Sequence, residues 1–285
     1  MKFAVIDVGS NSVRLMLSDG MRTFYKRVKT TRLAEGLGEE KTLKEQPVFR
    51  TVQAISDFVI QAKTENADKI YIFATAAVRQ AQNKEYFLTK VENACGIKVD
   101  VVEGEMEAKL GYMGTLNGGD GGVIDVGGAS SEIIVVKGGE TLYCKSVNIG
   151  AVRIKDLVGQ DKDAVDKLAF DKVSEYGCVP NAQFYAIGGT ATTVAAMLQE
   201  LQPYDPEKTH GYVVCRDALG CLTDKLFSMT VEERKKLKGL QPERAEVIGG
   251  GARLLLAIMD KLKITSFTVS ESDNLEGYLM TKLEK

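Results

Sequence analysis

Short apolar runs alternate along the chain with stretches in which apolar residues recur at helical spacing. Apolar runs bounded by Gly, Asp or Asn predict strands, and they lie at 3–8, 12–18, 22–30, 69–74, 97–102, 123–126, 132–136, 141–147, 183–187 and 264–270. The helical spacing predicts amphipathic helices, at 47–62, 83–95, 104–114, 161–176, 190–201, 216–228, 231–238, 243–262 and 274–284. The segment after strand 69–74, which contains Arg79, is expected to be a loop. The alternation of strands and helices is typical of an α/β protein.

The apolar run that opens the chain recurs in its second half. Segment 5–12 (Val-Ile-Asp-Val-Gly-Ser-Asn-Ser) corresponds to segment 123–131 (Val-Ile-Asp-Val-Gly-Gly-Ala-Ser-Ser). In both copies an apolar strand and a Gly-containing hairpin turn follow. Such a repeat predicts two domains with related cores, separated at the Gly-rich segment 117–122. We therefore expect domains at residues 1–117 and 118–285, with the last helix packing back on the first.

Composition excludes several kinds of site. The 285 residues include one histidine, His210, which rules out metal sites built from several histidines and disfavours a His-based catalytic triad. With 37 basic and 39 acidic residues the net charge is −2, and no nucleic-acid partner is expected. Any catalysis must therefore rest on carboxylates, hydroxyls, backbone amides, Arg or Lys, or a bound cation.

Cysteine usage and hydropathy indicate the compartment. The five cysteines form no CxxC pair, so we expect reduced thiols, most of them buried, in a cytoplasmic protein. The N-terminal apolar run becomes polar at Asp7, too early for a signal peptide. Because no apolar run approaches about 18 residues, we expect no membrane-spanning helix and no membrane partner.

Each copy of the repeat ends its strand in a carboxylate, Asp7 or Asp125, and then turns through Gly and hydroxyl residues. Successive backbone amides in such a turn can point at a phosphate, and the Ser and Asn side chains add donors. The candidate donors are Ser10, Asn11, Ser12, Gly127, Gly128, Ser130 and Ser131. Either loop alone is equally an ordinary hairpin turn. At equivalent places of a repeat, the two predict a phosphate clamp across an interdomain cleft.

A third Gly turn, with Gly188, Gly189 and Thr190, follows strand 183–187 and opens a helix. A helix N-terminus binds anions through its free N–H groups and its dipole. The alternative is a simple strand-to-helix turn in which Thr190 is the N-cap residue.

Two charged positions are candidates for the chemistry itself. Arg79 follows a predicted buried strand, where its guanidinium can bind phosphate oxygens or simply lie at the surface. Glu107 lies in the first turn of a predicted helix, where acids favour the helix dipole. With imidazole nearly absent, Glu107 is also the candidate general base for activating a water. The basic runs at 26–32 and 234–238 are either solvated faces or a track for a long polyanion.

These motifs resemble those of the short, two-domain form of the exopolyphosphatase/guanosine pentaphosphate phosphatase (Ppx/GppA) family, a branch of the actin/Hsp70/sugar-kinase superfold. The matching segments run in family order at 4–12, 74–83, 102–109, 123–132, 148–153 and 186–190. The resemblance implies two actin-like (ribonuclease H-like) domains, each with a mixed sheet, and an active-site cleft between them. It also implies hydrolysis of a terminal phosphoanhydride that depends on Mg²⁺ or Mn²⁺, often with a monovalent cation such as K⁺, and a homodimer.

By motif, the resemblance places the family's catalytic Glu on Glu107 and its phosphate-contacting Arg on Arg79. Its metal-associated carboxylates fall on Asp7, Asp125 and Glu132, and Asp125 also counts among the catalytic residues. The loop donors fall on the residues of the three Gly turns named above.

Three segments depart from the family's usual pattern. Segment 103–109 reads Glu-Gly-Glu-Met-Glu-Ala-Lys in place of Ser-Gly-x-Glu-Glu-Ala-Arg, although Glu107 is retained. Ala129 replaces a Gly, which adds a methyl near the expected phosphate and disfavours a positive φ. Segment 274–277 reads Asn-Leu-Glu-Gly in place of Leu-Arg-Glu-Gly, so an arginine is lost.

The leading hypothesis is an exopolyphosphatase that releases orthophosphate from the ends of inorganic polyphosphate. The same chemistry on guanosine pentaphosphate (pppGpp) is the nearest alternative. The altered loops also fit a sensor that binds polyphosphate or a nucleotide without hydrolysis. A kinase of the same superfold would need an acceptor pocket, which no motif indicates.

Overall fold

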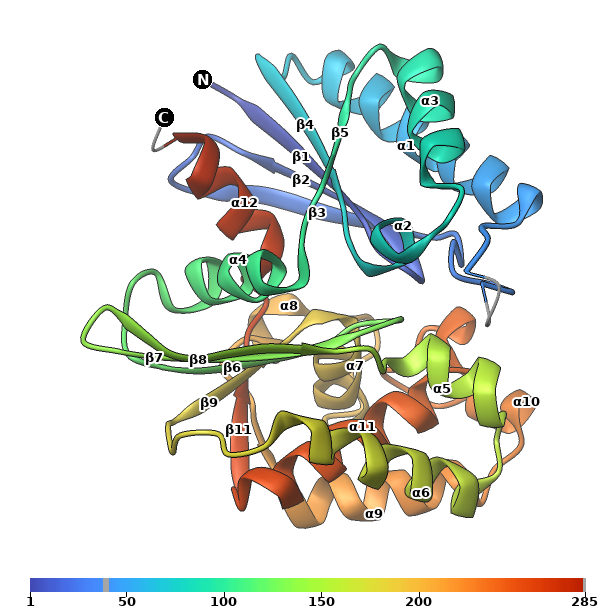
Figure 1. The fold of residues 1–285 in the computed structure, drawn as a ribbon, viewed down its shortest axis with the longest axis vertical. Coiled ribbons are helices and arrows are strands. Elements are labelled where there is room, and N and C mark those ends of the chain that lie inside the picture. Colours follow the sequence, from blue (N-terminus) through green and yellow to red (C-terminus); the bar gives the residue numbers. More distant parts are fainter. Residues whose placement is uncertain (38–40, 284–285) are drawn as a thin grey trace.

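The computed structural model describes residues 1–37 and 41–283. The last residue of the predicted helix 274–284 lies outside the described residues. In the described part, the strands form a five-stranded and a six-stranded sheet. The two sheets lie one above the other, and α4 (Gly104–Leu116) and α12 (Asn274–Leu283) lie where they meet (Figure 1).

The first sheet has the strand order β3-β2-β1-β4-β5. Its strands are β1 (Phe3–Val8), β2 (Ser12–Ser18), β3 (Thr23–Thr30), β4 (Lys69–Ala74) and β5 (Val99–Val101). Strand β1 pairs antiparallel with β2 and parallel with β4. All six residues of β1 are buried because both faces of the sheet are covered. One face carries α1 (Glu45–Thr64), α2 (Ala76–Gln80) and α3 (Lys84–Cys95), and the other carries α12.

The second sheet has the order β10-β11-β9-β6-β7-β8. Its strands are β6 (Gly121–Val126), β7 (Ser131–Lys137), β8 (Glu140–Val147), β9 (Phe184–Ile187), β10 (Val213–Cys215) and β11 (Ser266–Val269). The face away from the first sheet packs on helices that form the largest core (Figure 1). These are α5 (Ala151–Val158), α6 (Lys162–Val173), α7 (Gly188–Leu198), α9 (Arg216–Phe227) and α11 (Ile248–Leu262). Short helical turns complete this half: η1 (Ser174–Tyr176), α8 (Pro206–Thr209), α10 (Val231–Arg234) and η2 (Pro242–Arg244).

Helix α4 lies against both sheets, and α12 packs on α4 and on the first sheet. Ala108 of α4 packs with Val123 and Ile134 of the second sheet, whereas Leu110 belongs to a cluster with Phe73 and Leu275. Where α4 and α12 cross, Gly114 and Gly277 let the two backbones touch, because a Cβ at either position would overlap the opposite main chain. The helix that carries Glu107 is therefore held rigidly between the two halves.

The two copies of the sequence repeat have the same local topology. In each copy a strand of the sheet centre turns back into an antiparallel partner and also pairs parallel with a later strand. The turns match in detail: Gly9 N donates to Ser12 O at 3.0 Å, and Gly127 N donates to Ser130 O at 3.1 Å. The repeat therefore brings two equivalent Gly turns to the junction of the sheets.

Several local expectations are wrong. The segment with Arg79 is the short helix α2 rather than a loop, while α5 and β10 are elements that the pattern missed. Helix α11 begins at Ile248, later than the expected 243, because the residues before it form the turn η2. Most cysteines are not buried: Cys178, Cys215 and Cys221 are exposed, and all five are free.

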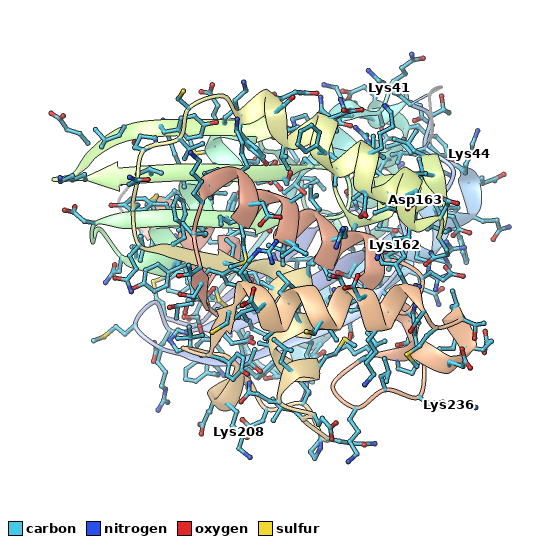
Figure 2. All side chains as sticks on the ribbon, turned by 90° about the horizontal axis from the view of Figure 1, so that it is seen from below. Lys41, Lys44, Lys162, Asp163, Lys208 and Lys236 are labelled. Atoms are coloured by element: carbon cyan, nitrogen blue, oxygen red, sulfur yellow. The ribbon has the colours of Figure 1, made fainter. Side chains whose placement is uncertain are left out.

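Most basic residues of the run 26–32 form ion pairs, and those of the run 234–238 do not lie together on one surface. In the run 26–32, Lys26, Lys29 and Arg32 each form an ion pair with an acidic residue. In the run 234–238, Arg234 is buried and Lys236 points outward at the edge of the molecule (Figure 2). Among residues 1–37 and 41–283, no helix combines the length and apolar character needed to span a bilayer.

Candidate active site

The three predicted Gly turns line one pocket between the sheets. Its wall includes most of the residues predicted from sequence, namely Asp7, Ser10, Asn11, Ser12, Glu107, Asp125, Gly127, Gly128, Ser130, Gly188, Gly189 and Thr190. The first two loops nearly touch, since a Cβ on Gly128 would lie 2.7 Å from Ser10 Cβ and 3.4 Å from Asn11 N. Loops from the two halves of the chain therefore face each other across this pocket.

The second loop is fixed from behind by α5. Gly127 O accepts a hydrogen bond from Ala151 N, and Gly128 O accepts from Val152 N, each at 2.9 Å. The carbonyls of the loop are thus turned toward the start of α5. Ala129 is not among the described residues with positive φ, so its methyl group causes no backbone strain.

The third loop opens α7. Gly188 has φ +80° and lies directly beside Asp125, where a side chain would collide with the carboxylate. Thr190 is not the N-cap residue: its Oγ1 donates to Val126 O at 2.9 Å, and the helix begins two residues earlier. The hydroxyl of Thr190 therefore joins the third loop to the second.

Glu107 is buried in the pocket wall and is oriented by Arg79. Nη1 of Arg79 donates to Glu107 Oε2 at 2.8 Å and to Val102 O at 2.6 Å. Burial raises the pKa of Glu107 above that of an ordinary glutamate, although the charge of Arg79 opposes the shift. A carboxylate with a raised pKa is a stronger base, which suits a group that must take a proton from water.

Asp125 and Glu132 lie next to Glu107 in the same buried acidic region. Burial and the charge of Glu107 raise the pKa of Asp125 to about 8. Glu132, directly opposite Asp125 across the β6–β7 pair, has its pKa raised well above the ordinary value by burial and by both neighbours. Buried like charges repel strongly, so a further cation bound near these three carboxylates would favour their charged forms.

Three predicted residues stand outside the pocket wall in the structure. Arg79 stands behind Glu107 and contacts the pocket through it. Ser131 is buried and accepts a hydrogen bond from Tyr176 at 2.7 Å, and Glu132 accepts one from Ser146 at 2.6 Å. His210 is also elsewhere, where its Nδ1 accepts a hydrogen bond from Glu271 N.

The pocket contains residues that sequence reasoning missed, above all Arg14, Arg244 and Asn274. Arg14 binds Asp7 through Nε at 2.9 Å and through Nη2, and its Nη1 binds Asp273. Asn274 donates to Asp125 Oδ2 at 3.2 Å. Burial and the nearby Arg14 lower the pKa of Arg244, whose guanidinium lies over Gly189.

Of these three pocket residues, only Arg14 lies at a position that the sequence repeat could have indicated. It lies opposite Asp7 in the β1–β2 register, as Glu132 lies opposite Asp125 in the β6–β7 register. The repeat therefore marks it. Arg244 and Asn274 lie at a helical turn and a strand-to-helix corner, where no pattern in the sequence indicates a site.

The donor set fits a hydrated divalent cation better than a closed metal site. Within the described residues, no three His, Cys, Asp or Glu side chains stand close enough together to hold a metal ion. In the same part of the chain, the buried oxygens Asp7 Oδ1, Glu132 Oε2 and Asn274 Oδ1 have no hydrogen-bond partner. Mg²⁺ commonly keeps several waters and binds one or two carboxylates together with substrate phosphates. A pocket with a few unpartnered oxygens and no complete set of protein ligands matches this preference.

The family model for the Ppx/GppA phosphatase family matches residues 11–285. This chain belongs to the Ppx/GppA phosphatase family. A guanosine-5'-triphosphate,3'-diphosphate pyrophosphatase of Aliivibrio fischeri is 32% identical over 96% of this chain and 58% of its own. An exopolyphosphatase 2 of Mycobacterium tuberculosis is 26% identical over 98% of both chains. The crystal structure of the Aquifex aeolicus Ppx/GppA family member superposes with a TM-score of 0.81 at 27% identity, over 100% of this chain and 98% of that one.

These comparisons confirm the resemblance and the fold class. The protein is a member of the Ppx/GppA phosphatase family with an α/β fold and a mixed sheet in each half. The chain spans about half of the length of the first curated relatives it matches, between 46% and 59%. The activity and the substrate therefore have to be argued from the site.

Proposed function

We propose that this protein is an exopolyphosphatase that hydrolyses the terminal phosphoanhydride bond of inorganic polyphosphate and releases orthophosphate. The observation that carries the proposal is the buried Glu107–Arg79 pair, 2.8 Å apart, with Glu107 facing a pocket built from three Gly turns. The similarity to an exopolyphosphatase 2 over 98% of both chains supports the choice of substrate.

In the proposed mechanism, the three loops hold the terminal phosphate. Backbone amides and the Ser10, Asn11, Ser12, Ser130 and Thr190 side chains supply donors, and Ser131 supports the second loop from behind. Asn11 Nδ2 is buried and has no partner within the described residues, so it is available to a phosphate oxygen. Such preorganised donors stabilise the charge that develops on the phosphoryl oxygens.

Glu107 acts as the general base. Its carboxylate accepts a proton from a water whose oxygen attacks the terminal phosphorus. The bond between that phosphorus and the bridging oxygen breaks, the shortened polyphosphate leaves with the bridging oxygen, and the water oxygen stays on the released orthophosphate. Arg79 fixes the Glu107 carboxylate and offsets its negative charge. Exclusion of bulk water by the buried wall strengthens each of these interactions.

We propose that Asp7 and Asp125 hold a hydrated Mg²⁺ or Mn²⁺, and that the unpartnered Oε2 of Glu132 accepts a hydrogen bond from one of the waters on that cation. When bound, this cation neutralises charge on the phosphate oxygens. A monovalent cation such as K⁺ and a homodimer, both implied by the family resemblance, stay predictions, as does the domain boundary at 117/118.

Hydrolysis of guanosine pentaphosphate is the second candidate, because the guanosine-5'-triphosphate,3'-diphosphate pyrophosphatase of Aliivibrio fischeri is 32% identical over 96% of this chain. The test is phosphate release from long-chain polyphosphate, guanosine pentaphosphate, ATP and p-nitrophenyl phosphate in Mg²⁺, with the Glu107→Gln variant beside the wild type. Preferred turnover of polyphosphate supports the proposal, and preferred turnover of guanosine pentaphosphate favours the second candidate. Tight binding without release from any of them would identify a sensor.

A further inference from the structure

Asp273 occupies the corner between β11 and α12, directly beside the proposed active site. It precedes the first residue of α12, and its Oδ1 accepts a hydrogen bond from Leu275 N at 3.0 Å. A reciprocal hydrogen bond runs from the backbone of Asp273 to the side chain of Glu276, whose Oε2 accepts from Asp273 N at 3.0 Å. Only 5% of Asp273 is exposed, so its carboxylate is a fixed buried group.

The second oxygen of the carboxylate is directed at the pocket. Oδ2 of Asp273 accepts a hydrogen bond from Nη1 of Arg14, a pocket residue. Asp7 takes the opposite side of the same guanidinium through Nε and Nη2. Arg14 is therefore held between two buried carboxylates, one from each end of the chain.

A carboxylate and a phosphate compete for the same feature of an arginine, because both accept two parallel N–H donors in one plane. The other arginines near the pocket show the contrast. Arg79 is committed to Glu107. Arg244 lines the pocket with Gln241 as its hydrogen-bond partner, and no acidic side chain of the described chain forms an ion pair with it.

We propose that Asp273 is an internal anion that competes with substrate phosphate for Arg14 and thereby limits how tightly the site binds phosphate. This proposal rests on the proposed function, which identifies the ligand as a phosphate chain. Asp273 in this role limits affinity through Arg14 and takes no part in the chemical step. It directly precedes segment 274–277, at which this chain departs from the usual family pattern.

The decisive variant is Asp273→Asn, which removes the charge but keeps an acceptor for the start of α12, since Asn and Asp are equally good N-cap residues. Binding of inorganic tripolyphosphate is measured by titration calorimetry in Mg²⁺ buffer on the Glu107→Gln background, so that turnover does not interfere. We expect about tenfold tighter binding, the change that one charge-assisted hydrogen bond supplies. Orthophosphate should bind more tightly in the same proportion.

A purely structural role for Asp273 predicts the opposite sign, because a loosened Arg14 binds anions less well. Unchanged or weaker binding in Asp273→Asn would therefore overturn the proposal. Asp273→Ser is the second variant, because Ser also caps helices while its side chain is shorter; the same gain is expected. The matched control is Asp100→Asn, which removes an anchor of α12 at Lys282 and Tyr278 without touching Arg14 and should leave binding unchanged.

The gain must also depend on Arg14. In an Arg14→Gln background, Asp273→Asn should no longer tighten binding, and a gain that persists there would assign the effect to general charge instead. Binding and turnover separate the two proposals. Tighter tripolyphosphate binding in Asp273→Asn, together with no phosphate release by the protein that retains Glu107, would sink the exopolyphosphatase proposal and leave this one standing. Phosphate release by the wild type, with no tighter binding in Asp273→Asn, would overturn this proposal and leave the exopolyphosphatase proposal standing.

Discussion

Nη1 of Arg79 donates a 2.8 Å hydrogen bond to Oε2 of Glu107, and so joins α2 to α4 at the edge of the pocket. Both side chains are largely buried, at 13% and 8% exposure. Because a buried ion pair fixes its members in one geometry, this contact determines where the Glu107 carboxylate points. It also adjusts how strongly Glu107 holds a proton.

Replacing Glu107 by Gln should remove the base while keeping its shape. We expect kcat for phosphate release to fall by about 10²–10⁴-fold, with a small change in KM, because general-base catalysis contributes that much to the transition state. Steady-state phosphate release measures both constants. The control is Glu105→Gln on the exposed side of the same helical turn, which should retain full activity. Equal losses in both variants would argue against Glu107 as the base.

Replacing Arg79 by Gln should move the pH dependence of the reaction. Arg79 lowers the pKa of Glu107 against the larger effect of burial, so its removal raises that pKa further. A base works only when deprotonated, and the acidic limb of kcat/KM should therefore shift to higher pH, with about a tenfold loss of rate at neutral pH. The measurement is the pH–rate profile of both proteins. A uniform loss of rate with an unmoved limb would restrict Arg79 to binding substrate.

The main features of the fold were predictable from the apolar pattern, because most buried strands contain a continuous apolar run and each long helix contains several turns of the helical apolar spacing. Strand β1 and its counterpart β6 contain a continuous apolar run that ends at Asp7 or Asp125, and each is followed by a Gly, so their position is unambiguous. Two of the missed elements are very short. Helix α2 and strand β10 have five and three residues, too few for a period to show, and tertiary contacts decide their conformation.

The candidate site was predictable where it follows the repeat and unpredictable where distant chain segments meet. Asp7 and Asp125 end equivalent strands, and their neighbours across the hairpins are Arg14 and Glu132. One copy therefore balances its aspartate with a cation, while the other places a second acid beside it. The corner at Asp273 and Asn274 joins this site from the far end of the chain, and that proximity exists only after folding.

Asp125 should make stability depend on pH. In the unfolded chain it loses its proton near pH 3.8, whereas in the folded protein the pKa is about 8. The stability gained from the protonated form is thus present at low pH and lost as the pH rises through about 8. Asp125→Asn has no charge to bury, so in EDTA its free energy of unfolding should exceed that of the wild type by at least about 1 kcal/mol at pH 8.5 and by less at pH 5.5.

Thermal or urea unfolding at the two pH values checks this expectation. The matched control is Asp163→Asn, because Asp163 is exposed at the start of α6 on the surface of the molecule (Figure 2). Its effect should be the same at both pH values. A variant Asp125→Asn that is no more stable than the wild type at pH 8.5 would show that Asp125 titrates like an exposed acid.

Salt should affect long and short polyphosphate alike. A basic track would add ionic contacts for every extra phosphate of a long chain, and its KM would then rise more steeply with ionic strength. The run at 26–32 does not offer a continuous track. Lys26, Lys29 and Arg32 are paired with Glu276, Asp57 and Glu246, and Arg27 lies over the ring of Tyr25. We therefore expect equal slopes of log KM against log salt for tripolyphosphate and for long polyphosphate, and no change in either slope in Lys29→Gln. A steeper slope for the long polymer that flattens in Lys29→Gln would instead identify this strand as a polymer-binding face.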